Sequence, residues 1–278
     1  MWIDEKLCRI CLVSSRLSDL YRLNLDSEAP RFLRELSELL EEQSRTEAFT
    51  RSFNLVRRIA RSKDPYAGYK RELWTLGWRI ARRVEDYLKA IGWRLDEALR
   101  LAAAANIIDT SVLGYEPVDL EKAVWDRPWI EEIQEIPRDE IVYIAVDNAG
   151  EAAVDMVLAE ALRANGYEVK LAVRSESYEI DVTWEELEST TEIEVVKTPG
   201  NKPPVLYLNE GFIIAKGIAN LEAYLEDEDK ETKETLHLLR AKCNVLAAMF
   251  KIPKNAPIIA TGKTIRELLS TYKRVNRQ

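Results

Sequence analysis

Three side chains with oxygen ligands, Asp147, Asn148 and Asp181, could hold a hard metal ion. Asp147 and Asn148 directly follow the apolar run at residues 141–146, and Asp181 lies shortly after a second strand-like run at residues 167–173. In open α/β sheets, ligands bind at the carboxyl ends of the strands, so these side chains are expected on one rim. Carboxylate and amide oxygens, without sulfur or imidazole, suit magnesium or manganese. The sequence therefore predicts a metal site at these three residues.

The same rim should also attract an anion. Gly150 permits a sharp turn, and the helix predicted at residues 151–163 points its free N–H groups toward the rim. Lys216 follows a strand candidate at residues 212–215 and would add a mobile positive charge. Together these groups favour phosphoryl chemistry, in which a carboxylate acts as nucleophile or aims a metal-bound water. The spacing leaves both routes open.

The elements that must position these residues form an α/β domain behind a helical region. Further strands are predicted at residues 192–197 and 257–260, and helices starting at Thr183 and spanning residues 235–250. The first hundred residues contain helical periodicity and almost no strand-like run. We predict a helical domain at 1–115, a connection with a short helix at 116–138, and an α/β domain at 139–278. An alanine-rich helix at residues 95–109 would carry Asn106 and Asp109 on one face.

Composition excludes several other classes of protein. The net charge is −8 with both signs interspersed, so nucleic acid is not expected as the main partner. No apolar run approaches the roughly 18 residues of a membrane span, and the first residues do not resemble a signal peptide, so we expect a cytoplasmic protein without a membrane partner. The only histidine, His237, is expected in a leucine-rich helix, which makes a serine–histidine mechanism improbable. Cys8 and Cys11 have the spacing of a metal or redox pair, but no second pair follows.

The chain resembles the metal-dependent damage-control phosphatases, a family long catalogued as domain of unknown function 89. The resemblance extends over nearly the whole chain and is carried by six short motifs in order: Cys8-x-x-Cys11, Ala105-Asn106-Ile-Ile-Asp109, Asp147-Asn-Ala-Gly-Glu151 with Asp155, Ile180-Asp-Val-Thr183, Lys216-Gly-x-x-Asn220-x-Glu222, and Arg240-Ala-Lys-Cys243.

This resemblance implies a fold, an activity and a set of site residues. The fold would be a Rossmann-like three-layer α/β domain with an N-terminal α-helical domain. The activity would be hydrolysis of a small phosphorylated metabolite, such as a sugar phosphate or a damaged cofactor intermediate, with manganese, magnesium, nickel or cobalt. The implied metal ligands are Asp147, Asn148 and Asp181. The other implied site residues are Glu151, Asp155, Lys216 and Asn220 in the phosphate pocket, with Asn106, Asp109 and Lys242 nearby.

Two alternatives to a phosphatase stay open at this point. Gly211 stands where family members often carry an aspartate, which permits a non-enzymatic protein that binds a phosphorylated ligand. A strand, a glycine-bearing turn and a helix also describe an adenosylmethionine-dependent methyltransferase, although the turn has a single glycine, Gly150. The sequence specifies neither the substrate nor the oligomeric state.

Overall fold

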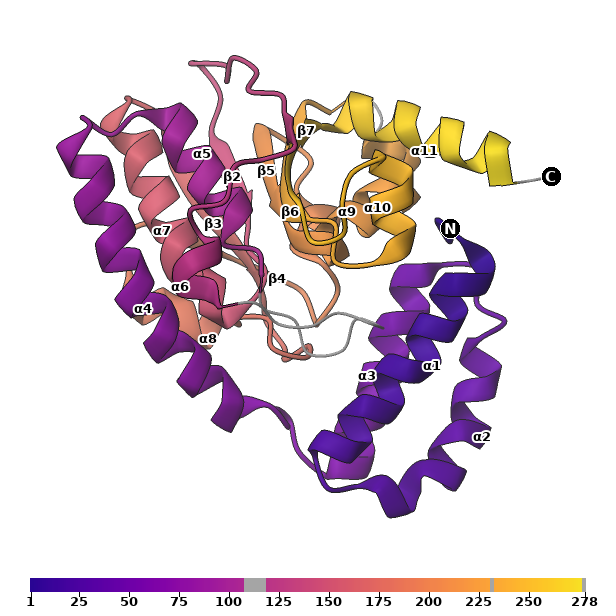
Figure 1. The fold of residues 1–278 in the computed structure, drawn as a ribbon. Coiled ribbons are helices and arrows are strands. Elements are labelled where there is room, and N and C mark those ends of the chain that lie inside the picture. The colour runs from indigo at the N-terminus through magenta and orange to yellow at the C-terminus, as the bar shows by residue number, and fades with distance from the viewer. Residues whose placement is uncertain (108–118, 231–232, 277–278) are drawn as a thin grey trace.

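The computed structural model describes residues 1–107, 119–230 and 233–276, and it contains one seven-stranded sheet (Figure 1). The strand order is β1-β7-β6-β5-β2-β3-β4. Strands β2 to β6 are parallel, whereas β7 runs antiparallel to β6 and pairs with β1 in parallel. The strands are β1 (Ile130–Glu131), β2 (Val142–Ala145), β3 (Val169–Arg174), β4 (Glu194–Thr198), β5 (Phe212–Lys216), β6 (Thr235–Arg240) and β7 (Pro257–Thr261).

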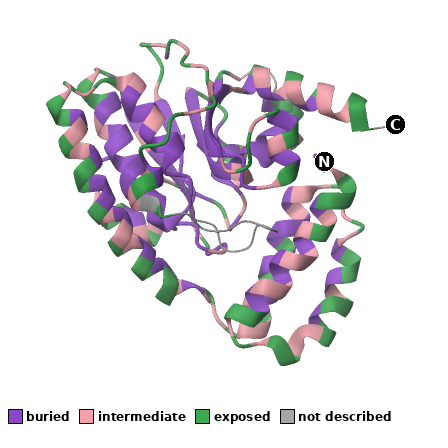
Figure 2. Cartoon of the chain, in the orientation of Figure 1, coloured by how far each residue is buried: buried purple, intermediate pink, exposed green. Residues whose placement is uncertain are grey.

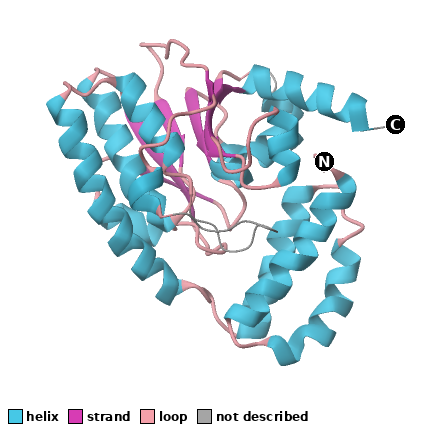
Figure 3. Ribbon diagram, in the orientation of Figure 1, coloured by secondary structure: helices cyan, strands magenta, loops and turns pink. Residues whose placement is uncertain are grey.

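Helices cover both faces of this sheet, which gives the expected three-layer α/β architecture (Figures 1 and 3). On one face, α5 and α4 pack against α7, and on the other face lie α9, α10 and α11. The helices are α1 (Glu5–Arg22), α2 (Ala29–Leu39), α3 (Arg45–Ala60), α4 (Ala67–Ala90), α5 (Leu95–Ala104), α6 (Leu120–Ala123), α7 (Ala149–Ala164), α8 (Trp184–Leu187), α9 (Gly217–Glu226), α10 (Asn244–Phe250) and α11 (Gly262–Asn276). None of the helices in the described residues is long and apolar enough to span a membrane.

The centre of the sheet is buried on both faces, as Figure 2 shows in purple. Every residue of β2, β5 and β6 is buried, because helices cover both sides of these strands. Such strands lack the alternation of apolar and polar residues that marks a half-exposed strand. The close contact between α4 and α7 needs glycine, since a Cβ at Gly77 would lie 2.3 Å from the carbonyl oxygen of Gly150.

Helices α1, α2 and α3 form a lobe beside the carboxyl ends of the strands (Figure 1). Apolar side chains such as Phe32, Phe53 and Val56 fill its interior. Ion pairs join the lobe to the α/β domain: Arg16 pairs with Glu179, and Arg45 pairs with Glu222. The carboxylate of Glu226 at the end of α9 also accepts the backbone N–H groups of Arg45 and Thr46 at the start of α3, at 2.6 and 3.1 Å.

The prediction of a helix at residues 235–250 was wrong. The first part of this segment is β6 in the middle of the sheet, and only Asn244–Phe250 is helical. His237 therefore lies in a strand and is fully buried, with Nε2 3.2 Å from the Thr235 hydroxyl. The leucines at 236, 238 and 239 imitate helical spacing because β6 buries both of its faces.

Most other predicted elements occur close to their expected positions. The capping box at Thr183 is present at the start of α8. Helix α5 ends at Ala104 rather than near residue 109. The connection at 116–138 contains the short helix α6 and also β1, which was not predicted. Asp109 lies outside the described residues, and the predicted domain boundaries stay predictions.

Candidate metal and phosphate site

Asp147 and Asn148 stand where β2 ends and α7 begins. Asn148 is the N-cap residue of α7. The loop after β3 runs alongside: Asn148 and Asp181 form an isolated antiparallel bridge, and the N–H of Val182 donates to the carbonyl of Asp147 at 3.0 Å. Backbone hydrogen bonds thus hold the three predicted metal ligands together on the rim of the sheet.

A glycine in the next strand–helix turn makes room for the Asp147 carboxylate. Gly217 follows β5 and has φ +73°, a conformation that side chains rarely adopt. A Cβ at this position would lie 1.7 Å from Oδ2 of Asp147. The position therefore needs glycine both for its backbone conformation and for space.

Two asparagines and a glutamate fix the orientation of the Asp147 side chain. The amide nitrogen of Asn106, just after α5, donates to Oδ2 of Asp147 at 3.2 Å and to Oε2 of Glu151 at 2.6 Å. Asn148 donates to Oε1 of Glu151 at 2.9 Å. The backbone N–H of Arg240 donates to the amide oxygen of Asn106 at 3.2 Å, which fixes that amide. Since the nitrogen of Asn148 points at Glu151, its oxygen is the atom that suits a cation.

Burial changes the protonation of the carboxyl groups in this network. Burial raises the pKa of Asp181 to about 8, although the nearby Arg174 guanidinium opposes the shift. Arg174 Nε donates to Oδ2 of Asp181 at 2.6 Å. Burial also raises the pKa of Glu151, against the attraction of Lys242 and Lys216. A bound cation would favour the ionised form of both groups.

A pocket of about 70 Å³ opens onto these residues between the helical lobe and the rim of the sheet. It is lined by Cys11, Ser15, Arg45, Phe49, Asp147, Asn148, Tyr178, Glu179, Asp181, Ile218, Ala219 and Glu222. Four of these residues are acidic, and three of them are paired with arginines: Glu179 with Arg16, Asp181 with Arg174, and Glu222 with Arg45. A divalent cation beside Asp147 and Asp181 would favour their ionised forms and attract a phosphate dianion.

The donor set fits such a cation. Asp147, Asn148 and Asp181 supply hard oxygens, as magnesium and manganese require, and each of them lines the pocket. Within the described ranges, no three His, Cys, Asp or Glu side chains are arranged to hold a metal ion. The predicted ligands are two carboxylates and one amide oxygen, so solvent and substrate oxygens would complete the coordination.

Four other predicted site residues lie beneath the pocket rather than in its lining. Lys216 is fully buried, 2.7 Å from Oδ1 of Asp155, and donates to the carbonyl of Ala102, so it is not the mobile cation that we expected. Asn220 accepts the N–H of Val205 at 3.1 Å and donates to the carbonyl of Lys216 at 2.8 Å. Lys242 is also buried. The roles predicted for these residues in phosphate binding stay predictions.

Sequence reasoning did not assign several residues that line the pocket. Arg45 and Phe49 come from α3, and their ring–guanidinium distance is 4.0 Å. Glu179 comes from the loop before Asp181 and has φ +45°. Glu222 belongs to the Lys216–Glu222 motif, but no role was predicted for it from the sequence. Its position in that motif could have identified it as a site residue. Arg45, Phe49 and Glu179 could not have been identified in this way, because their places in the pocket depend on the packing of the lobe.

Gly211 does not remove a carboxylate from the site. It has φ +68°, and a Cβ there would lie 2.4 Å from the carbonyl oxygen of Ile141. Gly211 and Ile141 stand at the amino ends of β5 and β2, whereas the pocket lies at the carboxyl ends. The reason for considering a catalytically incomplete pocket therefore does not apply.

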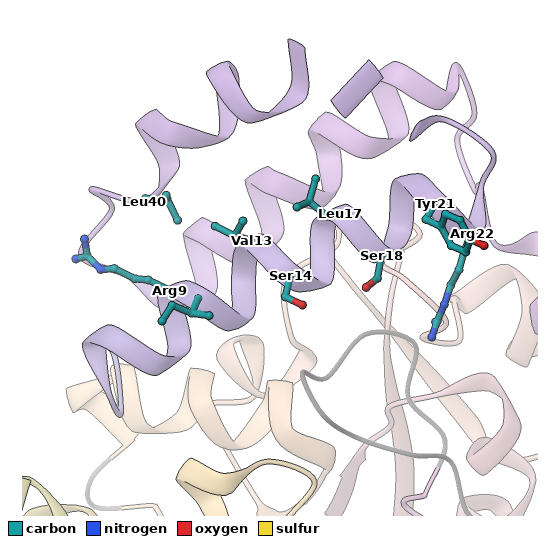
Figure 4. A pocket seen from close by; sticks show the side chains of 9 residues that line it. Arg9, Val13, Ser14, Leu17, Ser18, Tyr21, Arg22 and Leu40 are labelled. Atoms are coloured by element: carbon teal, nitrogen blue, oxygen red, sulfur yellow. The ribbon is translucent and has the colours of Figure 1, made fainter. Parts of the chain in front are cut away.

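A larger cavity, of about 720 Å³, lies along α1 in the helical lobe. Figure 4 shows its lining from α1, including Val13, Leu17 and Tyr21, together with Leu40 after α2. None of the predicted ligands lines it. The smaller pocket is the one that combines oxygen ligands, an adjacent helix N-terminus and buried charge.

Comparison with known proteins shows the family to which this chain belongs. The damage-control phosphatase ARMT1-like domain matches residues 5–258, so the chain belongs to the damage-control phosphatase family. Among individual relatives, it is 30% identical to damage-control phosphatase PH1575 of Pyrococcus horikoshii over 224 residues, which cover 72% of this chain and 75% of the relative. It is 27% identical to the uncharacterized protein MJ0202 of Methanocaldococcus jannaschii over 223 residues, 69% of this chain and 71% of that protein.

The fold is shared with a solved structure. The crystal structure of a DUF89 family protein from Pyrococcus horikoshii superposes with a TM-score of 0.71 at 28% identity, covering 92% of this chain and 98% of that one. The family resemblance seen in the sequence motifs is thus confirmed over nearly the whole chain.

Proposed function

We propose that this protein is a divalent-metal-dependent phosphatase that hydrolyses a small phosphorylated metabolite. The observation that carries this proposal is the acidic pocket in which Asp147, Asn148 and Asp181 are held together by the bridge between two rim loops. Membership of the damage-control phosphatase family supports the same activity. Manganese, magnesium, nickel and cobalt are the candidate metals.

In this mechanism Asp147, Asn148 and Asp181 would hold the metal. The metal, when bound, would neutralise charge on the phosphoryl oxygens and act as a Lewis acid. The N-terminus of α7 points its N–H groups toward the same rim and favours the anionic group. Glu151 fixes the amides of Asn106 and Asn148, which keeps Asp147 in one orientation during the reaction.

The charged groups beneath the pocket would support this arrangement. Lys216 and Lys242 both attract the carboxylate of Glu151 and so oppose its protonation. Lys216 is held by Asp155, which prevents it from reaching into the pocket. We therefore expect Lys216 to act on Glu151 through its positive charge, and to fix the backbone where β5 ends and α9 begins.

The test is phosphate release from p-nitrophenyl phosphate and a panel of sugar and cofactor phosphates. Chelated protein should release no phosphate, and activity should return with at least one of the four metals. Asp147→Asn and Asp181→Asn should each lose at least about a hundredfold in kcat/KM, because removal of one preorganised charged group costs this much. Asp139→Asn, at an exposed aspartate outside the pocket, is the matched control and should retain activity.

Two outcomes would reject the proposal. Equal activity of the chelated and metal-loaded protein would show that no metal is needed. Metal binding at these residues without phosphate release from any ester would favour the alternative of a phospholigand-binding protein.

A methyltransferase is disfavoured. Adenosylmethionine would have to approach the backbone of the turn after β2 closely, and the side chains of Asp147 and Asn148 occupy that turn. The expected cytoplasmic location, like the expected absence of nucleic-acid and membrane partners, stays a prediction.

A further inference from the structure

A second cavity adjoins the pocket that contains the predicted metal ligands. It has a volume of about 200 Å³ and shares four lining residues with that pocket: Cys11, Arg45, Ile218 and Glu222. The two spaces therefore meet at these four side chains. The ion pair between Arg45 and Glu222 stands at their junction.

The second cavity has a largely apolar lining. Besides the shared residues, it is lined by Ile3, Leu7, Cys8, Cys243, Asn244, Val245 and Leu246. All three cysteines of the chain thus face one space, although Cys8 and Cys243 are far apart in the sequence. Arg45, Glu222 and Asn244 are its polar side chains, and two of these three are paired with each other.

Two of the thiols in this cavity, Cys8 and Cys243, behave as apolar groups at neutral pH. Burial raises the pKa of Cys8 to about 11 and that of Cys243 to about 12, so both are protonated. Free protonated cysteine packs like a small hydrophobic residue. The sulfur of Cys243 also accepts the N–H of Leu246 at 3.4 Å at the start of α10. Cys8 and Cys243 therefore present protonated, largely apolar surfaces to this cavity.

The pocket at the metal ligands is too small for a whole metabolite. Its volume of about 70 Å³ is several times smaller than the roughly 300 to 1,000 Å³ of common sites for organic ligands. The organic part of a phosphate ester must therefore extend beyond the first pocket. Of two spaces that share lining residues with it, the second cavity offers about 200 Å³ and the other only about 10 Å³.

We propose that the second cavity binds the organic group of the substrate and selects phosphate esters whose organic group is apolar, with a few carbon atoms. Resting on the proposed phosphatase function, this inference narrows its substrate class. A polyhydroxylated sugar would lose hydrogen bonds to water against the leucine, isoleucine, valine and thiol surfaces. The Arg45–Glu222 pair would contact a polar group near the phosphate, at the junction of the two spaces.

The experiment compares kcat/KM for a series of n-alkyl phosphates from methyl to hexyl phosphate, with glucose 6-phosphate alongside. If the alkyl chain enters the cavity, kcat/KM should rise about fourfold per methylene until the cavity is full. Hexyl phosphate should then exceed glucose 6-phosphate. Affinities of the corresponding alkylphosphonates, measured by calorimetry with manganese-loaded protein, should follow the same order without requiring hydrolysis.

A variant that fills part of the second cavity tests whether the alkyl chain binds there. Val245→Phe adds volume to the wall of the second cavity and should lower the hexyl-to-methyl ratio of kcat/KM by at least about tenfold. Ile10→Phe also introduces phenylalanine, but Ile10 lines the larger cavity along α1 and not the second cavity, so this control should keep the wild-type ratio.

The results separate this inference from the proposed function. Phosphate release with equal or falling kcat/KM along the alkyl series would overturn the apolar subsite while leaving a phosphatase. An unchanged ratio in Val245→Phe would overturn it as well. Phosphonate affinity that rises with chain length, in protein that hydrolyses none of the esters, would support the subsite and reject the phosphatase.

Discussion

Substitution of Gly217 by alanine should damage the site while every charged group stays in place. The added Cβ would lie 1.7 Å from Oδ2 of Asp147, and real Cβ contacts are essentially never under 3.0 Å. The carboxylate must therefore move by more than 1 Å, away from the position that Asn106 supports. A misplacement of about 1 Å near the reacting groups costs roughly a hundredfold in rate. We expect this loss in kcat/KM, together with weaker manganese binding.

Gly92→Ala is a close control, because Gly92 also has φ +73° but no atom lies within 4 Å of the position that its Cβ would occupy. Each substitution should cost about 1 kcal/mol through the left-handed backbone conformation. That corresponds to a fall of roughly 2–4 °C in Tm for a chain of this size. Only Gly217→Ala should also lose activity beyond that change in stability.

The assays are metal-dependent phosphate release, calorimetric manganese titration and thermal unfolding of both variants. A folded Gly217→Ala protein with the manganese affinity and kcat/KM of Gly92→Ala would refute the reasoning. It would show that the position of the Asp147 carboxylate against this turn is not needed for function.

The remaining predictions concern buried charges. Lys216→Ala leaves Asp155 uncompensated and should lower the free energy of unfolding by about 3–5 kcal/mol, whereas Lys216→Met with Asp155→Leu should recover much of it in urea denaturation. Burial lowers the pKa of His237 to about 3, so between about pH 6.5 and 3 the unfolded chain binds a proton that the native protein does not. Stability should therefore fall as pH falls through this range, and less steeply in His237→Gln; equal slopes would contradict the assignment. Glu226→Ala removes the acceptor for the first N–H groups of α3 and should lower the free energy of unfolding of the helical lobe by about 1–3 kcal/mol, measured as faster proteolysis of the lobe. An unchanged proteolysis rate would show that these hydrogen bonds do not stabilise the lobe.

Much of the fold could be predicted from local sequence. Apolar runs identified β2 and β5, because strands covered on both faces need continuous apolar residues. The capping pattern placed the start of α8 at Thr183. The same local logic misassigned β6, since its fully buried leucines carry no strand alternation and imitate helical spacing.

The predicted ligands were accessible to sequence reasoning because each follows a strand. Parallel strands end at one edge of the sheet, so Asp147 and Asp181 could be expected on one rim. Their contact depends on the bridge between two loops, which lies beyond what the sequence pattern specifies. Lys216 was expected on the same rim for the same reason, but its direction, toward Asp155 and beneath the pocket, is set by the packing of α7.

The sequence by itself determined most of the strands and helices, although not β1 or β6, and it determined which strand ends carry oxygen ligands. Only the tertiary structure decided which groups from the helical lobe line the pocket. Arg45 reaches Glu222 and Cys8 shares a cavity with Cys243 because α1 and α3 pack beside α9 and α10. These contacts join residues that lie far apart along the chain, and no local spacing encodes them. Short-range hydrogen bonds and apolar periodicity specify most elements, whereas the strand at β6 and the pocket depend on the long-range packing of the whole chain.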